Sequence, residues 1–190
     1  MIYADIGLIP PKIIEENIEK IRFILRNVNI YGNHEPHITL YPNSFNNPND
    51  IEKIIKKVIK HYKPFEVEII GLKQLKDPIS NTKIIVYEIK KTKILSQLQR
   101  ELFEELNKIR TKDQEKWLLK NITKPSKRII ENIKRFGYPF SPDDWIFHVS
   151  IASVIGKFDL SLLKDYEVKT RFIVNEIGIF LENENELLKL

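Results

Sequence analysis

The chain has 190 residues, of which 42% are hydrophobic and 30% charged, and its formal net charge is +5. These values are ordinary for one globular domain, and the mild positive charge says only that a polyanion is tolerated nearby. The absence of cysteine excludes disulfides, thiolate zinc sites and a cysteine nucleophile. No apolar run is long enough to span a bilayer and no secretory signal is apparent, so we expect a cytoplasmic protein without a membrane partner.

The first part of the chain alternates predicted strands with predicted helices. A strand ends at Pro10-Pro11, and the helix after it repeats its apolar residues every three or four positions. Asn49 or Asp50 is expected to cap the second helix. The predicted strands are residues 2–9, 34–42, 65–70 and 84–89, and the apolar stripes of the predicted helices cover 14–28, 51–62 and 95–109.

The second part of the chain has a weaker pattern between residues 111 and 144. Further along we expect a strand at 145–152, a short helix or turn at 160–163, a last strand over 171–180 and a closing hairpin arm at Leu187-Leu188. Strands with short connections, mixed with crossing helices, indicate an α+β fold. Within 111–144 the predicted helices are 116–121 and, after a Ser126 cap, 129–136.

One four-residue pattern occurs twice, in residues 37–40 and again in residues 148–151: histidine, aliphatic, hydroxyl, aliphatic. Each copy alone is weak, because a hydroxyl residue two positions after a histidine arises freely by chance. Two copies in predicted strands, among only four histidines, favour a shared site. The alternative is a structural or interaction protein with coincidental motifs, and strands that lie far apart would support it.

Alternation along a strand puts the polar residues of each pattern on one face. His37, Thr39 and Tyr41 are therefore predicted to share one face of their strand, and His148 shares one face of the second strand with Ser150. Tyr41 is a candidate substrate-binding residue, since a base can stack on an exposed aromatic ring. Its alternative role is to cover the end of the sheet.

Two histidines and two hydroxyls meet the needs of metal-independent phosphodiester cleavage. One group removes a proton from the attacking oxygen, another protonates the leaving oxygen, and donors meet the charge on the phosphate oxygens. Imidazole titrates near neutral pH, so His37 and His148 can serve as the base and the acid. Thr39 and Ser150 can donate to the phosphate. We therefore expect a phosphoric diester hydrolase that uses no metal and no cofactor.

The remaining histidines and nearby carboxylates are expected to take no part in catalysis. His34 stands three residues before His37, a spacing that puts the two imidazoles on opposite faces of a strand, so they are not expected to hold a metal together. His61 follows a Lys-rich helix and is expected at the surface. Asp143 and Asp144 are expected to form a turn, and orientation of an imidazole is their alternative role.

The sequence resembles the two-histidine (2H) phosphoesterase superfamily, which includes the 2′-5′ RNA ligases and RNA 2′,3′-cyclic phosphodiesterases. The first motif, with Pro36 before His37, is similar to that family's first signature, and the second is similar with Ser150 in place of the commoner threonine. The predicted strands and helices agree over most of the chain outside 111–144. One departure is Phe147, which stands where the family usually has proline.

This resemblance implies one bilobal domain over residues 1–190, with two antiparallel sheets flanked by helices around a central cleft. The two histidines would face each other there as acid and base, and Thr39 and Ser150 would donate to the phosphate. Which histidine is the acid stays open. Residues 111–144 are a candidate lid or insertion. The segment's basic residues could meet RNA phosphates or form a solvated helix face: Lys124, Lys127, Arg128, Lys134 and Arg135.

The leading functional prediction is opening of 2′,3′-cyclic phosphate ends of RNA, with reversible 2′-5′ ligation as a related activity. Small cyclic nucleotides, 2′-5′ oligoadenylates or an ADP-ribose cyclic phosphate are alternative substrates for the same chemistry. A small cleft rimmed by aromatic residues favours small nucleotides, whereas a basic groove past the histidines favours RNA. A non-catalytic RNA-binding module is the alternative from another class. The protein is expected to be a monomer.

Overall fold

The computed structural model describes residues 2–28, 35–77, 79–80, 82–181 and 185–189. The strands are β1 (Ile2–Leu8), β2 (Ile38–Phe45), β3 (Phe65–Lys76), β4 (Thr82–Ile89), β5 (His148–Ile155), β6 (Thr170–Val174), β7 (Glu176–Leu181) and β8 (Asn185–Lys189). They form one sheet in the order β6-β3-β4-β5-β2-β1-β7-β8. Every neighbouring pair is antiparallel, which confirms the predicted α+β class.

The sheet has two halves, β6-β3-β4-β5 and β2-β1-β7-β8, and the junction between them is narrow. The β2–β5 contact consists of a single register pair, Ile38 with Val149. By contrast, β4 and β5 pair along most of their length. The two predicted antiparallel sheets are therefore the halves of one sheet that meet at a single point.

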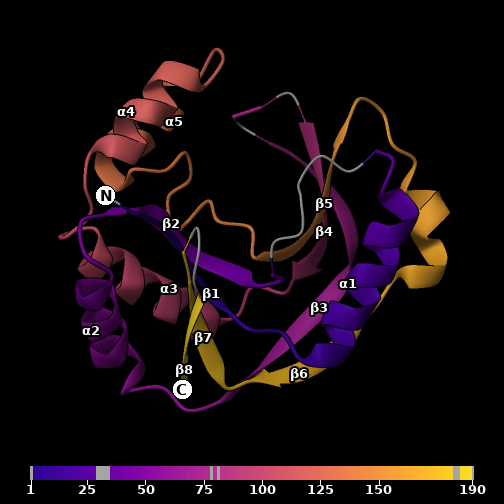
Figure 1. The fold of residues 1–190 in the computed structure, drawn as a ribbon, viewed down its shortest axis with the longest axis horizontal. Coiled ribbons are helices and arrows are strands. Elements are labelled where there is room, and N and C mark those ends of the chain that lie inside the picture. The colour runs from indigo at the N-terminus through magenta and orange to yellow at the C-terminus, as the bar shows by residue number, and fades with distance from the viewer. Residues whose placement is uncertain (1, 29–34, 78, 81, 182–184, 190) are drawn as a thin grey trace.

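Each half is covered by its own helices. The helices are α1 (Lys12–Leu25), α2 (Pro48–Ile59), α3 (Lys93–Leu106), α4 (Asp113–Asn121), α5 (Lys127–Phe136) and the 3-10 helix η1 (Leu160–Tyr166). Figure 1 shows α1 and η1 beside one half, α2 and α3 beside the other, and α4 with α5 as a separate pair. Helix α1 packs on β5, and α3 packs on β2. No helix among the described residues is both long and apolar enough to cross a membrane.

Apolar stripes explain why the helices pack where they do. In α3, Leu95, Leu98, Leu102 and Leu106 are all 0% exposed, and they belong to a core cluster that includes residues of both halves. Burying each leucine stabilises the fold by roughly 1.5–3 kcal/mol relative to exposure.

Helix caps were predicted with mixed success. The Ser126 side chain accepts a hydrogen bond from the Ile129 backbone N–H at the start of α5, as predicted. The cap of α2 is Asn47, which accepts from the Asn49 N–H, so the prediction of Asn49 or Asp50 is wrong. The reason is that Pro48 occupies the first helical position and moves the start of the helix forward.

Two strand predictions also differ from the structure. The strand predicted to end at Pro42 continues to Phe45, with Pro42 paired to Asp5 of β1. The single last strand predicted over 171–180 is two strands, because the chain crosses at Asn175 from one half of the sheet to the other. Strand β6 pairs with β3, whereas β7 pairs with β1. The closing arm is confirmed as β8.

Candidate active site

Strands β2 and β5 bring the two predicted motifs together at the centre of the sheet. Their only register pair joins Ile38 of the first motif to Val149 of the second, and both side chains are 0% exposed. Each motif thus buries its first aliphatic residue, as the alternation predicts. Strands that lie far apart would have supported the coincidence alternative, and the contact between β2 and β5 does not give it that support.

The polar residues of both motifs flank this buried pair. In an antiparallel register, the neighbours of Ile38 and Val149 lie opposite one another and point to the other face of the sheet. Thr39 is therefore set across from His148, and His37 across from Ser150. All four side chains are partly exposed.

Both imidazoles are held through the same ring nitrogen. Nδ1 of His37 lies 2.9 Å from the Glu35 carbonyl oxygen, and Nδ1 of His148 lies 2.7 Å from the Ile146 carbonyl oxygen. A carbonyl oxygen only accepts, so Nδ1 carries the proton in each ring. Nε2 is then the nitrogen that remains for proton transfer, as base in a neutral ring and as acid in a charged one.

A platform of two glycines and one aromatic ring supports His37. The imidazole stacks on Phe180 of β7, with ring centroids 4.1 Å apart. A Cβ at Gly7 would lie 2.7 Å from His37 Cδ2, and a Cβ at Gly178 would lie 2.7 Å from the Phe180 ring. Gly7 and Gly178 are register partners in β1 and β7. Sequence reasoning missed these residues, although a lone glycine inside a strand signals a close approach.

His148 lies in a different environment. Burial lowers its pKa below the usual 6.5, while the Ile146 carbonyl opposes that shift. The nearby His37 lowers the pKa further, and Glu88, which pairs with His148 across β4 and β5, raises it. Because the first cause is the largest, we expect His148 to favour its neutral form near neutral pH.

A cavity of about 350 Å³ lies beside the motifs and contains Thr39, His148 and Ser150 in its wall. We call it the motif pocket. Trp145 is one of several aromatic residues in its wall, and its Nε1 donates to the Thr39 carbonyl oxygen at 3.1 Å. Lys76 is the one cationic side chain among the described residues of its wall. The other aromatic and charged wall residues are Tyr3, Tyr138, Phe140, Asp5, Asp77 and Asp144.

Residues 111–144 contribute directly to one side of the motif pocket. Tyr138 and Phe140 of this segment lie in the wall. The segment also contacts the half of the sheet that contains β3. Ile79, which follows β3, packs against a small buried cluster in α4, α5 and their connection. That cluster consists of Leu118, Ile122 and Ile133.

The basic residues of this segment have protein partners at three positions. Arg128 forms an ion pair with Asp144 at 2.6 Å. Lys127 lies 3.9 Å from Glu131, and the Arg135 guanidinium lies over the Phe136 ring. Contact of these cations with RNA phosphates stays a prediction.

The prediction that Tyr41 faces the cleft is wrong. Its side chain is 0% exposed and packs edge-on against Phe103 of α3. The cause is a β-bulge at Leu40, where the register of β2 against β1 skips one residue. A bulge breaks the alternation, so Tyr41 turns into the core, while Pro42 lies in the wall of the motif pocket. A base cannot stack on the buried ring.

The secondary candidates lie as follows. Asp144 forms the expected turn, in which its N–H donates to the Ser141 carbonyl at 3.1 Å, and Asp143 forms an ion pair with Arg100. His61 is exposed after α2, as predicted. His34 lies outside the described residues.

Phe147, the departure from the family pattern, is 1% exposed, and its carbonyl accepts from the Ile89 N–H at 2.9 Å. The residue directly before the second motif is therefore buried in the core and bonded to the end of β4. Among the described residues, no group of three or more His, Asp or Glu side chains is placed to hold a metal ion.

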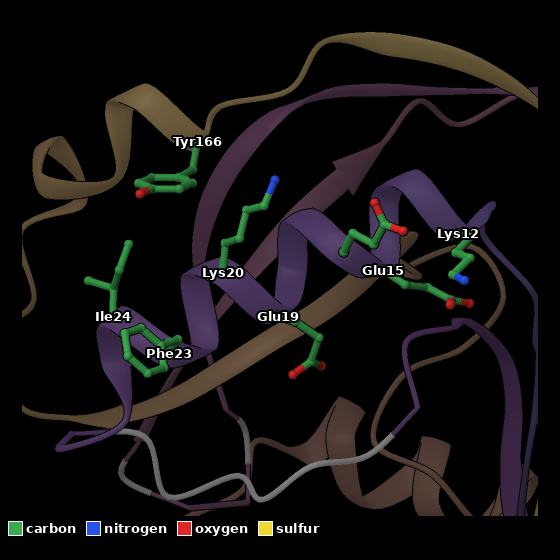
Figure 2. Close-up of a pocket in the computed structure, with 8 residues that line it drawn as sticks. Lys12, Glu15, Glu19, Lys20, Phe23, Ile24 and Tyr166 are labelled. Carbon is green, nitrogen blue, oxygen red and sulfur yellow. The ribbon is translucent and has the colours of Figure 1, made fainter.

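A second, shallow depression lies on the outer side of α1. Figure 2 shows its wall, in which charged residues of α1 stand beside Phe23, Ile24 and the Tyr166 ring of η1. None of the four polar motif residues belongs to this wall. The motif pocket is therefore the depression that matches the predicted chemistry.

Comparisons with known proteins agree with the fold and the motifs. The sequence model of the 2′-5′ RNA ligase superfamily matches residues 9–184. No curated protein matches the sequence. The protein TT0787 of Thermus thermophilus is similar in structure, with a TM-score of 0.60 and 10% identity over 99% of this chain and 94% of that chain.

Two further solved structures are similar. E. coli LigT complexed with ATP has a TM-score of 0.54 and 11% identity over 100% of this chain and 95% of that chain. A protein described as a phosphoesterase has a TM-score of 0.54 and 11% identity, over 100% of this chain and 96% of that chain. At such low identities, the structural likeness shows a common fold.

Proposed function

The chain belongs to the 2′-5′ RNA ligase superfamily, and we propose that it is a metal-independent phosphodiesterase that opens 2′,3′-cyclic phosphates at RNA ends. Joining or cleaving 2′-5′ linkages would use the same groups. The observation that carries the proposal is the meeting of both motifs at the Ile38–Val149 pair. Two imidazoles, each with its Nε2 available, and two hydroxyls stand around that pair.

The proposed reaction assigns one role to each polar motif residue. His148 accepts a proton from the attacking water, because its lowered pKa keeps the ring neutral near pH 7. His37 donates a proton to the ester oxygen that leaves, which opens the cyclic phosphate. Thr39 and Ser150 donate hydrogen bonds to the non-bridging oxygens, where charge gathers in the transition state.

The pH at which kcat/KM falls on the acid side should follow the His148 pKa. The base must be neutral, and the lowered pKa keeps it neutral down to a pH below 6.5. We therefore expect kcat/KM to fall at acid pH only below pH 6.5. The Glu88 charge raises the His148 pKa, so Glu88→Gln should move this acid limb of the pH profile to lower pH. A limb that moves to higher pH in Glu88→Gln would contradict the assignment of His148 as the base.

The direct test is turnover of a short RNA that ends in a 2′,3′-cyclic phosphate, measured in EDTA with the product end identified. Formation of a single 2′- or 3′-phosphate isomer is the expected result, and the isomer shows which ester bond breaks. Inhibition by EDTA that a divalent ion reverses would overturn the metal-independent mechanism. RNA binding without turnover would instead support a non-catalytic RNA-binding module.

The composition of the motif pocket favours small nucleotides as a second candidate substrate class. The pocket is about 350 Å³, and its wall has several aromatic side chains but only Lys76 as a cation among the described residues. An aromatic wall suits a base or nucleoside, whereas a long RNA needs a basic track along its backbone. Comparison of kcat/KM for nucleoside 2′,3′-cyclic phosphates, 2′-5′ oligoadenylates and cyclic-phosphate RNAs of increasing length decides between the classes. A value that rises with RNA length favours RNA.

A further inference from the structure

Both motif strands carry a β-bulge at the third residue after the histidine. The register of β2 against β1 skips Leu40, three positions after His37. The register of β5 against β4 skips Ile151, three positions after His148. In each strand, the bulge therefore follows directly after the hydroxyl residue of the motif.

A bulge at this position sets the direction of the motif side chains. The extra residue bends the strand and raises its local twist, and such bulges re-aim side chains beside active sites. Leu40 and Ile151 are both 0% exposed, whereas Thr39 and Ser150 lie in the wall of the motif pocket. Tyr41 and Ala152, which regular alternation would return to the pocket face, are also 0% exposed, so each bulge interrupts the alternation.

Each bulge residue receives a hydrogen bond from a buried side chain of the helix packed on that strand. Gln99 of α3 donates from Nε2 to the Leu40 carbonyl at 3.3 Å. Arg22 of α1 donates from Nε to the Ile151 carbonyl at 2.9 Å. Gln99 is 0% exposed and Arg22 is 6% exposed. The two halves of the protein thus support their motif strands by the same arrangement, with different residue types.

Stability alone does not account for polar residues at these two positions. Arg22 Nη2 and Gln99 Oε1 are buried and hydrogen-bond to none of the described residues. Buried polar atoms without partners are destabilising, and an apolar side chain of the same size would avoid them. Arg22 also forms an ion pair with Glu19 at 2.7 Å. Figure 2 shows Glu19 on the side of α1 that faces the shallow depression.

We propose that Gln99 and Arg22 are paired positioning residues, which hold the bulges of β2 and β5 and thereby the imidazole and hydroxyl of each strand. The inference rests on the proposed catalytic roles of the motif residues. It assigns Gln99 to the His37 strand and Arg22 to the His148 strand. Each helix side chain acts on one motif only, because each reaches one bulge carbonyl.

The test replaces each donor by an apolar side chain of similar length. Gln99→Met and Arg22→Met should lower kcat between about 10- and 100-fold with little change in KM, since a 1 Å displacement of catalytic groups costs about 10²-fold in rate. Arg22→Lys keeps a donor and should recover part of the loss. Gln97→Met in α3 and Arg26→Met, directly after α1, replace exposed residues, and these controls should keep the wild-type kcat.

Nuclear magnetic resonance provides the readout that does not need turnover. The chain has four histidines, so each imidazole signal can be assigned by single replacement. Arg22→Met should shift the His148 ring and the Ser150 amide, and Gln99→Met should shift the His37 ring and the Thr39 amide. Folded variants with lower Tm but unchanged kcat and unchanged signals at these groups would overturn the inference. Absence of turnover in the wild-type protein would refute the proposed function and leave this readout intact.

Discussion

The first motif and the second motif have the same backbone plan but different surroundings. In both strands, the histidine Nδ1 bonds to a carbonyl two residues earlier, and a bulge follows the hydroxyl residue. The His37 ring, however, lies on an aromatic ring above a glycine pair, whereas His148 lies in the wall of the motif pocket beside Glu88. Stacking orients one imidazole, and burial lowers the pKa of the other. The difference teaches that two motifs with the same backbone plan can give their histidines different environments, which suits the opposite proton-transfer roles proposed for them.

The largest effect should come from removal of either imidazole. His37→Ala and His148→Ala should each lower kcat by about 10²–10⁴-fold, because each removes a general acid or base. Steady-state kinetics on the cyclic-phosphate substrate measures the loss. His61→Ala is the matched control, since that histidine is exposed and lies outside the site. Full activity in His148→Ala would end the assignment of two cooperating histidines.

Removal of the hydroxyls tests whether the two motifs contribute equally to phosphate binding. Thr39→Val and Ser150→Ala should each lower kcat by about 10²–10³-fold, the usual effect of losing one donor to a developing negative charge. The same assay compares the two variants. A large loss in one and none in the other would mean that the phosphate sits toward a single motif.

The glycine platform should matter for His37 alone. In Gly7→Ala, the new methyl would lie 2.7 Å from His37 Cδ2 and 3.0 Å from the Ile38 carbonyl oxygen, so the ring must move. We expect a loss in kcat of at least about 10-fold, since small displacements of reacting groups are costly. The His37 imidazole signal should shift, while that of His148 should stay.

Gly156→Ala is the matched control for this substitution. A Cβ at Gly156 meets no atom within 4 Å, although its positive φ of 81° makes any side chain there somewhat strained. We expect this variant to lose some stability and to keep its kcat. If Gly7→Ala left both kcat and the His37 signal unchanged, the platform would have no role in orienting the ring.

The sequence is sufficient for the features that depend on local pattern. Alternation locates both motif strands, and the leucine stripe locates α3 together with its buried face. Pattern reasoning fails where an extra residue or a chain crossing leaves no mark in the pattern. Residues 38–41 alternate aliphatic and hydroxyl-bearing side chains as a regular strand does, so alternation alone places Tyr41 on the wrong face. Residues 171–180 contain no proline and only one glycine, Gly178, so the crossing at Asn175 is not apparent.

The supports of the site are beyond sequence reasoning for a different reason. Phe180 stacks on a histidine that lies 143 residues earlier in the chain, and Arg22 reaches a carbonyl 129 residues later. Such contacts arise only when the sheet order brings β7 beside β1 and α1 onto β5. The two motif strands could therefore be predicted from the sequence, whereas the contacts around their polar residues could not.

The single Ile38–Val149 pair has a consequence for how the site is composed. The two halves share one hydrophobic core, yet their strands pair only at this place. The proposed acid and base stand beside that pair and come from different halves. A ligand bound between the two imidazoles would therefore contact both halves of the sheet at once.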